Sequence, residues 1–217
     1  MNRRRYLMSD AGVEIIMMNE SNPFVMSICY AQGWSSSPNF MTRYEASKVK
    51  SLGSVTFSGS GSNHNTTLLS FDELQYFTGL TKIPNSFLNY TDNCTSVIIP
   101  YGVTSIGNGF YNATGLTRIV FPETLTTFTA YSFRYCSSLE TVILPSSITS
   151  IQSNVFRFCS MLSSVTVLAT TPPALGTFAF NGNKSGRKFY VPADVVQAYK
   201  EADGWSNFAS SIYSIEE

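Results

Sequence analysis

The stretch YCSSLETVILPSSITSIQSNVFRFCSMLSSVTV, residues 135–167, contains nearly the same phrase twice, first as YCSSLETVIL and then as FCSMLSSVTV. Leu139 and Leu162 hold the same place in the two phrases and lie 23 residues apart, and Leu116 precedes Leu139 by the same interval. A period of roughly 20–50 residues is typical of chains that stack one structural unit on the next. The stretch therefore predicts a solenoid whose rungs contain 22 or 23 residues.

The repeat reads L-x-x-I-x-ϕ-P-x-x-ϕ-T-x-I-x-x-x-x-F, where ϕ is an apolar residue. β-Branched residues in its first half favour a strand, and the proline ends that strand because it donates no ladder hydrogen bond. A second short strand is expected at VTSI, LTTF and ITSI, followed by a turn that could include one helical turn. Stacking should align the apolar residues in interior columns. The expected columns are Cys94, Leu116, Leu139 and Leu162; Val97, Ile119, Val142 and Val165; Ile99, Phe121, Leu144 and Val167; Val103, Leu125 and Ile148; Ile106, Phe128 and Ile151; and Phe110, Phe133 and Phe156.

Two rougher copies flank these repeats. Their apolar residues are Leu80, Ile83 and Phe87 or Leu88 in the earlier copy, and Leu175, Phe178 and Phe180 in the later copy. The period and the leucine pattern are those of leucine-rich repeats. The predicted fold class is therefore a β-rich solenoid of leucine-rich repeats, with a short helical N-terminal region and a helical C-terminal cap.

The repeated cysteines, Cys136 and Cys159, share a column with Ala113. A position that accepts alanine requires a small buried residue, and a reduced thiol meets that requirement. Adjacent rungs would bring the two thiols close together, so the sequence leaves a disulfide between them open. Four cysteines without a CxxC pair and one histidine, His64, cannot supply a zinc site, so no metal and no cofactor are expected.

Composition argues against several classes of function. The chain of 217 residues has 14 Lys and Arg against 14 Asp and Glu, a formal net charge of zero. Nucleic acid is not an expected partner, because phosphate binding needs a concentrated positive field. Catalysis is not expected either, since His64 lies in a Gly/Ser loop with no paired nucleophile and carboxylates do not recur on one face.

The first residues were considered as a signal peptide because Arg3, Arg4 and Arg5 could begin one. Asp10 and Glu14 interrupt the apolar run that should follow, so no export signal is recognised. No run of about 18 apolar residues occurs, so membrane insertion is not expected.

Residues 1–65 do not repeat and are predicted to form a helix–loop–helix region that caps the solenoid or docks it to another structure. One helix is expected after Ser21 or Asn22, and another begins at Thr42, which has Glu45 at capping-box spacing. The loop between them is faintly similar to a calcium-binding loop but lacks the necessary acidic residues. Residues 57–67, FSGSGSNHNTT, are expected to be a flexible loop or linker.

Residues 66–217 are assigned to the solenoid, with a C-terminal cap from about residue 182. The run VPADVVQAYKEADGW predicts a helix with Pro192 in its first turn and a stop at Gly204. An open solenoid end exposes its apolar columns, so a plug is required. The residues expected to form it are Trp205, Phe208 and Ile212.

The run GLTRIVFPETLTTFTAYSFRYCSSLETVILPSSITSI, residues 115–151, resembles the BspA-like leucine-rich repeats, whose idealised phrase reads roughly AFxGCSSLTSVTIPSSVTSIG. The resemblance covers about residues 71–181, and the tail after residue 168 is similar to the ending of such proteins. It implies an adhesion or display module at an extracellular or virion surface, and it brings no catalytic residue. The alternative it implies is a structural phage component, a capsid or tail decoration or a receptor-binding protein, whose residues 1–65 dock to the particle.

Recognition is expected on side chains that point out of the solenoid. An exposed apolar stripe indicates a contact surface for a protein, although it could instead pack on the N-terminal segment or serve strand propensity. Three turn tyrosines could stack on a surface glycan, while the Ser and Thr residues of the opposite face are explained by pairing between strands. The candidate binding residues are Ile98, Val120, Ile143 and Thr166 in the stripe; Arg118, Thr141 and Ser164 beside it, after Ser96; and Tyr111, Tyr131 and Tyr135 on the turns.

Overall fold

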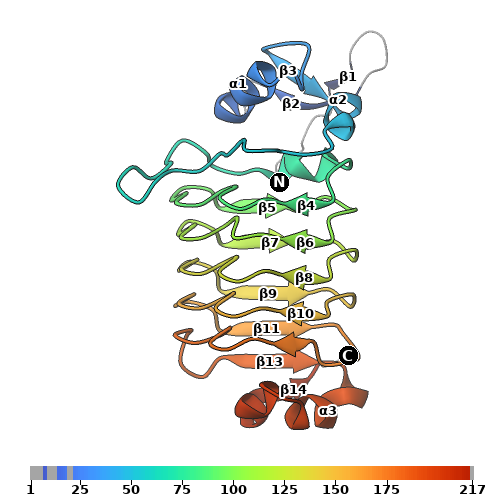
Figure 1. Cartoon of the computed structure of the whole chain (residues 1–217), viewed down its shortest axis with the longest axis vertical. Coiled ribbons are helices and arrows are strands. Elements are labelled where there is room, and N and C mark those ends of the chain that lie inside the picture. Colours follow the sequence, from blue (N-terminus) through green and yellow to red (C-terminus); the bar gives the residue numbers. More distant parts are fainter. Residues whose placement is uncertain (1–6, 9–13, 19–21, 216–217) are drawn as a thin grey trace.

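The computed structural model describes residues 7–8, 14–18 and 22–215. They form an elongated coil of stacked rungs, with helices and a small sheet at the N-terminal end and further helices at the C-terminal end (Figure 1). The expectations for Arg3, Arg4, Arg5 and Asp10 fall outside the described residues. Within the described part of the chain, no helix has the length and apolar character needed to cross a membrane.

Two series of parallel strands run along the coil, and each regular rung contributes one strand to each series (Figure 1). In the first series β5 pairs with β7, and β9, β11, β13 and β14 pair in that order; the second series forms one five-stranded sheet. The first series comprises β5 (Ser96–Ile98), β7 (Arg118–Val120), β9 (Thr141–Leu144), β11 (Ser164–Val167), β13 (Lys188–Val191) and β14 (Ile212–Ser214). The second comprises β4 (Lys82–Ile83), β6 (Ser105–Ile106), β8 (Thr127–Phe128), β10 (Ser150–Ile151) and β12 (Ala174–Leu175).

A proline turn joins the two strands of each regular rung. Pro122 follows β7 directly, and its carbonyl accepts a hydrogen bond from the Leu125 amide at 3.1 Å. Pro145 and Ile148 repeat this contact at 3.2 Å one rung later. The missing amide of proline therefore ends the first strand and redirects the chain into the second.

The strand register confirms the expected interior columns. Val97 lies opposite Ile119 in one ladder, and Val142 lies opposite Val165 in the next. The alternating burial along β9 places Val142 and Leu144 inside. The column of the repeated leucine is buried throughout, with Cys94 in the first place: Cys94, Leu116, Leu139 and Leu162.

A stack of phenylalanine rings fills the interior beside the turns. The rings of Phe133 and Phe156 are nearly parallel with centroids 5.3 Å apart, and Phe156 stacks on Phe180 at 5.4 Å. Phe178 was expected in the interior, and this prediction is wrong: its side chain is 59% exposed. Phe178 has a backbone φ of 58°, which turns it outward while Phe180 takes the interior place. Phe121 is only partly buried.

The four cysteines are free thiols and are buried. The Cys136 thiol donates to the Phe110 carbonyl at 3.2 Å, and the Cys159 thiol donates to the Phe133 carbonyl at 3.1 Å. Each thiol thus binds a carbonyl in the preceding rung, and Ala113 is buried in the same column. The structural reading of these cysteines fits this arrangement.

The N-terminal region contains both expected helices, α1 (Pro23–Ala31) and α2 (Arg43–Lys48). Asn22 precedes α1, and Thr42 forms a capping box with Glu45 at α2. The helix–loop–helix prediction missed an antiparallel sheet of β1 (Leu7–Met8), β2 (Glu14–Met18) and β3 (Phe40–Thr42). β3 has only three residues, and it becomes a strand because it pairs with the distant β2.

Residues 57–67 form a loop, but the prediction of a flexible linker is wrong. The Phe57 side chain is buried, and its ring contacts that of Phe87 with centroids 5.5 Å apart. The Asn65 side chain donates to the Phe57 carbonyl at 2.8 Å, and the Asn65 amide donates to the Tyr90 carbonyl at 2.9 Å. The glycine- and serine-rich composition hid these anchors, which hold the loop against the first rungs. The following turn is the 3₁₀ helix η1 (Asp72–Tyr76).

The C-terminal segment is more broken than the single helix expected from the sequence. It contains η2 (Ala193–Val195), α3 (Val196–Glu201) and η3 (Trp205–Ser211), separated at Gly204, whose φ is 76°. The buried Trp205 donates its indole N–H to the Pro173 carbonyl at 2.7 Å. Ile212 is buried in β14, and Phe208 is partly buried.

Candidate binding surfaces

The first strand series presents a continuous outward stripe, which we call the outer sheet face. Ile143 is 60% exposed at its centre and Val120 is 37% exposed beside it, while Ile98 and Thr166 are half-buried. The register places Ile98 opposite Val120, and Ile143 opposite Thr166. The structure thus brings the predicted stripe residues together on one surface.

A polar column runs beside the stripe and contains Ser96, Arg118, Thr141 and Ser164. The Arg118 guanidinium donates to the Ser96 hydroxyl at 3.2 Å, and that hydroxyl donates to the Asp72 carboxylate at 2.5 Å. Arg118 itself is exposed. The column therefore offers a cation and hydroxyl groups at the border of the apolar stripe.

The two columns border a shallow depression of about 570 Å³ over β7 and β9. Val120 and Ile143 line it from the stripe, and Arg118 and Thr141 line it from the polar column. Apolar centres with polar borders are the usual anatomy of a protein interface.

Sequence reasoning missed the continuation of this face into the C-terminal segment. Tyr190 pairs with Thr166, and Tyr213 pairs with Tyr190, so both tyrosines extend the stripe. Lys188 extends the polar column, and its ammonium lies 5.4 Å from the centroid of the Tyr213 ring. The alternating run KFYV could have revealed β13, because it repeats the SVTV pattern of β11 24 residues later.

The turn tyrosines lie in a second region, at one edge of the rungs. The Tyr111 ring contacts those of Tyr90 and Tyr135, with centroids 5.5 and 5.6 Å away. Tyr135 also stacks on Phe158 at 5.0 Å. Neighbouring rings therefore occupy much of the Tyr111 and Tyr135 surfaces, whereas Tyr131 is 39% exposed.

The Ser and Thr residues of the opposite sheet are engaged with the backbone. The hydroxyls of Thr104, Thr126 and Thr149 donate to carbonyls in the preceding rung, at 3.0 to 3.3 Å. This pattern accounts for the polar composition of that sheet without a ligand.

His64 is held by a carboxylate at the start of the coil. Its Nδ1 lies 2.8 Å from Asp92, which also accepts a hydrogen bond from the Thr114 hydroxyl at 2.6 Å. The Thr114 hydrogen bond is the main cause that lowers the pKa of Asp92, and His64 adds to it. The hydroxyl and the imidazole both face the same carboxylate, so this trio lacks the chain of contacts from hydroxyl to imidazole that would activate a nucleophile.

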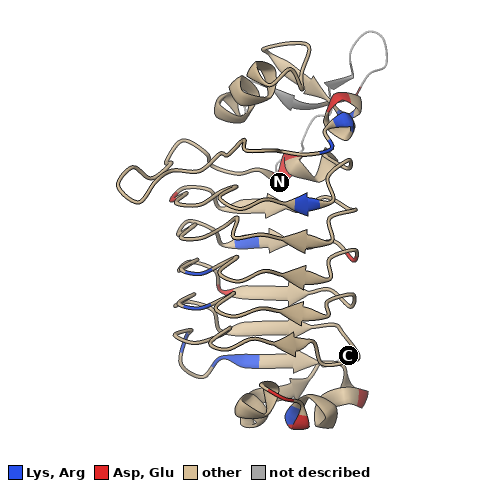
Figure 2. Ribbon diagram, in the orientation of Figure 1, with Lys and Arg blue, Asp and Glu red and all other residues tan. Residues whose placement is uncertain are grey.

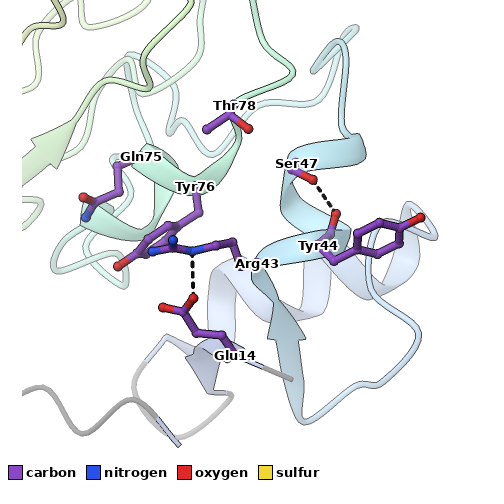
Figure 3. A pocket seen from close by; sticks show the side chains of 7 residues that line it. All are labelled: Glu14, Arg43, Tyr44, Ser47, Gln75, Tyr76 and Thr78. Carbon is purple, nitrogen blue, oxygen red and sulfur yellow. Dashed lines mark hydrogen bonds and ion pairs between the residues drawn. The ribbon is translucent and has the colours of Figure 1, made fainter. Parts of the chain in front are cut away.

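A cavity of about 650 Å³ lies between α2, β2 and η1, as Figure 3 shows. The Arg43 side chain crosses it, 3.0 Å from the Glu14 carboxylate and over the Tyr76 ring at 4.6 Å. These contacts connect the N-terminal sheet to the first turn of the coil. Elsewhere in the described residues, no group of three His, Cys, Asp or Glu side chains could hold a metal ion.

Solved leucine-rich repeat proteins share this fold in part. A T. pallidum leucine-rich repeat protein is 26% identical over 54% of this chain and 53% of its own, with a TM-score of 0.48. The pneumococcal vaccine antigen PcpA is 17% identical over 69% of this chain and 41% of its own, with a TM-score of 0.46. A leucine-rich repeat protein from Bacteroides ovatus is 19% identical over 64% of this chain and 40% of its own, with a TM-score of 0.40. The chain thus spans about half or less of the length of these proteins.

No curated protein matches the chain. The family profile described as the BspA type leucine rich repeat region matches residues 81–204 in six copies. That span covers more than half of the 217 residues and includes the rungs from β4 to α3. The chain therefore belongs to the BspA-type leucine-rich repeat family.

Proposed function

We propose that the chain is a recognition module that binds a partner protein through the outer sheet face. Its family is consistent with a protein-binding or adhesion role, and no enzymatic family is indicated. The exposed apolar stripe carries the proposal. Ile143 is 60% exposed, so its side chain contributes little to the interior and remains available for contact.

The polar column gives the surface its selectivity. Arg118 and Lys188 place positive charge on one side of the stripe, and Thr141 and Ser164 add hydroxyl groups between them. Charged groups at the border of an interface steer association and reject unsuitable partners more than they add affinity. The fitting partner therefore has an apolar patch with carboxylates beside it.

One alternative reading of the stripe was that it packs on the N-terminal segment. The described part of that segment lies at the end of the coil, away from β9 (Figure 1). The exposure of Ile143 supports a free surface. The other alternative, that the stripe serves strand propensity alone, predicts no loss of binding when it is removed.

We further propose display at a cell or virion surface, with residues 1–65 attaching the module to its carrier. This part rests on the family resemblance. Location of the chain on intact cells or particles by immunogold labelling would test it, because labelling confined to the cytoplasm contradicts display.

A photoreactive amino acid tests the binding surface directly. Placed at Thr141, on the polar column, it should cross-link a defined protein from a surface-protein extract. Placed at Thr127, on the opposite sheet, it should not. Equal cross-linking from both positions contradicts recognition by the outer sheet face.

Removing the stripe should abolish that cross-link. The double variant Val120→Ser and Ile143→Ser should lose the partner while its melting temperature stays nearly unchanged, since exposed residues contribute little to stability. Leu69→Ser is the matched control, because Leu69 is also exposed but lies on a loop before η1. Loss of the fold together with the partner in the double variant would refute the contact surface.

A further inference from the structure

A column of arginines and aromatic rings lines the turns at one edge of the coil. It contains Arg134 and Arg157, one rung apart, and we call it the arginine–aromatic edge. Figure 2 shows basic positions recurring on successive turns at this edge. The flanking residues of the edge are Tyr131, Tyr135, Phe158 and Phe178.

Aromatic rings hold the two guanidinium groups in place. The Arg134 guanidinium lies 4.7 Å from the centroid of the Tyr135 ring and 5.6 Å from that of Phe158. The Arg157 guanidinium lies 4.6 Å from the Phe158 centroid and 5.1 Å from that of Phe178. Such packing fixes the plane of a guanidinium and leaves its N–H groups to bind in that plane.

Most of the hydrogen-bonding capacity of these arginines is unused. Arg134 donates to the Tyr135 hydroxyl at 3.1 Å, and Arg157 donates to the Asn154 side chain at 3.1 Å. In both, the Nε atom is buried without a partner. No carboxylate of the described residues forms an ion pair with either group. Two positive groups on adjacent rungs therefore lack an anion.

Arg187, in the next rung, shows the contrast. Its Nη1 donates to the Phe180 carbonyl and to the Asn183 side chain, both at 2.8 Å. Its guanidinium also lies among the rings of the C-terminal segment, 4.6 Å from the Phe189 centroid. Arg187 therefore serves the packing of the last rungs and is not part of the edge.

The backbone of the edge is strained where it presents its rings. Tyr131, Tyr135, Phe158 and Phe178 all have φ values between 58° and 68°. Glycine adopts this left-handed region without cost, and Gly182 follows Tyr135 and Phe158 in the equivalent place of the next rung, with a φ of 72°. Such strain in non-glycine residues gathers at binding sites, because folding alone does not favour it.

We propose that the arginine–aromatic edge binds an acidic oligosaccharide, whose carboxylate or sulfate groups pair with Arg134 and Arg157. The planar guanidinium matches the paired oxygens of either anion. Tyr131 and Phe178, both exposed, flank the arginines and offer ring faces to the C–H groups of the sugar. The two cations are separated by about one rung, roughly 4.8 Å, so successive acidic sugar units can meet successive arginines.

Other polyanions fit this edge less well. An extended acidic peptide places side chains of one face about 6.8 Å apart, which does not match the rung spacing. A nucleic acid requires many phosphate contacts, and a chain with zero net charge does not provide them. Both classes enter the test as competitors.

Calorimetric titration of the full chain at low salt tests the proposal. The probes are oligogalacturonate, which carries carboxylates, a heparin-derived oligosaccharide, which carries sulfates, and a neutral cello-oligosaccharide of equal length. We expect an acidic oligosaccharide to bind at least tenfold more tightly than the neutral one, and the carboxylated and sulfated probes show which anion is preferred. Equal affinities for acidic and neutral sugars, no binding of either acidic probe at millimolar concentration, or tighter binding of oligoglutamate or single-stranded DNA would overturn the proposal.

The double variant Arg134→Gln and Arg157→Gln should lower the affinity for the acidic probe at least tenfold. The matched control is Lys50→Gln with Lys82→Gln, which removes the same charge from exposed positions elsewhere. Arg134→Lys with Arg157→Lys keeps the charge but loses the planar fork, so it should also weaken binding and covers the case in which the glutamine variant fails to fold. Unchanged affinity in folded edge variants, or an equal loss in the control, would contradict the assignment. The Val120→Ser and Ile143→Ser variant should still bind the sugar, so this proposal and the protein-binding surface fail independently.

Discussion

Val142 and Ile143 are neighbours in β9, yet they belong to two different regions of the molecule. Val142 is 2% exposed in the interior, where it pairs with Val165, whereas Ile143 is 60% exposed on the outer sheet face. Both are β-branched and apolar, so composition does not distinguish them. The period of two along a strand places one inside and the next outside.

The comparison teaches that the two sides of one strand answer to different requirements. The interior column from Val97 to Val165 contains only Val and Ile, because each side chain must fit against the rung before and after it. The outer stripe passes from Ile98 to Thr166 and on to the larger Tyr190. The outer side can vary without harm to the coil, so recognition is expected there.

The largest difference between the two regions should appear in the phenylalanines. Phe133→Ala removes a fully buried ring that stacks between Phe110 and Phe156, at 4.9 and 5.3 Å. The cavity left in the column should lower the free energy of unfolding by about 4 kcal/mol. Phe178→Ala removes an exposed ring and should cost less than about 1 kcal/mol. Urea denaturation of both variants measures the difference, and similar losses would show that Phe178 belongs to the interior.

A smaller effect should come from the buried thiols at alkaline pH. Burial raises the pKa of the Cys94 thiol from 9.0 to about 12, and the pKa of Cys29 likewise. The unfolded chain then loses protons at a lower pH than the folded chain, so the stabilisation is complete below pH 9 and is lost as the pH rises toward 12.

Urea denaturation at a series of pH values between 7 and 10.5 checks this expectation. Cys94→Ala should lose less stability across that interval than the unmodified chain does, because the alanine has no proton to lose. Tyr199, whose pKa is also raised by burial, is present in both proteins and does not affect the difference. A parallel decline of the two proteins would mean that Cys94 is not shielded from solvent.

The rungs could be predicted from the sequence because each one repeats its neighbours. Leu139 and Leu162 show the same environment twice, and Pro122 and Pro145 mark the same turn, so each position supports the reading of the other. Phe178 was misplaced because the last copies lengthen and the pattern no longer specifies which aromatic residue turns inward.

The non-repeating ends could be predicted only where a local signal exists. Thr42 and Glu45 predicted the start of α2, since a capping box lies within one turn. The pairing of β2 with β3, and the anchoring of Phe57 on Phe87, depend on residues far apart in the chain and leave no local pattern. The binding residues were predicted on the outer sheet face from the strand period, whereas Arg134 and Arg157 were missed because their unpaired state is a property of the packed turns.

The most direct test of the central claim is a matched pair of substitutions in β9, followed by urea denaturation. The claim is that recurring side chains stack inside the coil and leave the outer face free. Val142→Ser should lower the free energy of unfolding by about 3 kcal/mol, through lost burial and a buried hydroxyl. Ile143→Ser, one residue later, should change it by less than about 1 kcal/mol. Equal losses at the two positions, or a larger loss at Ile143, would contradict the account.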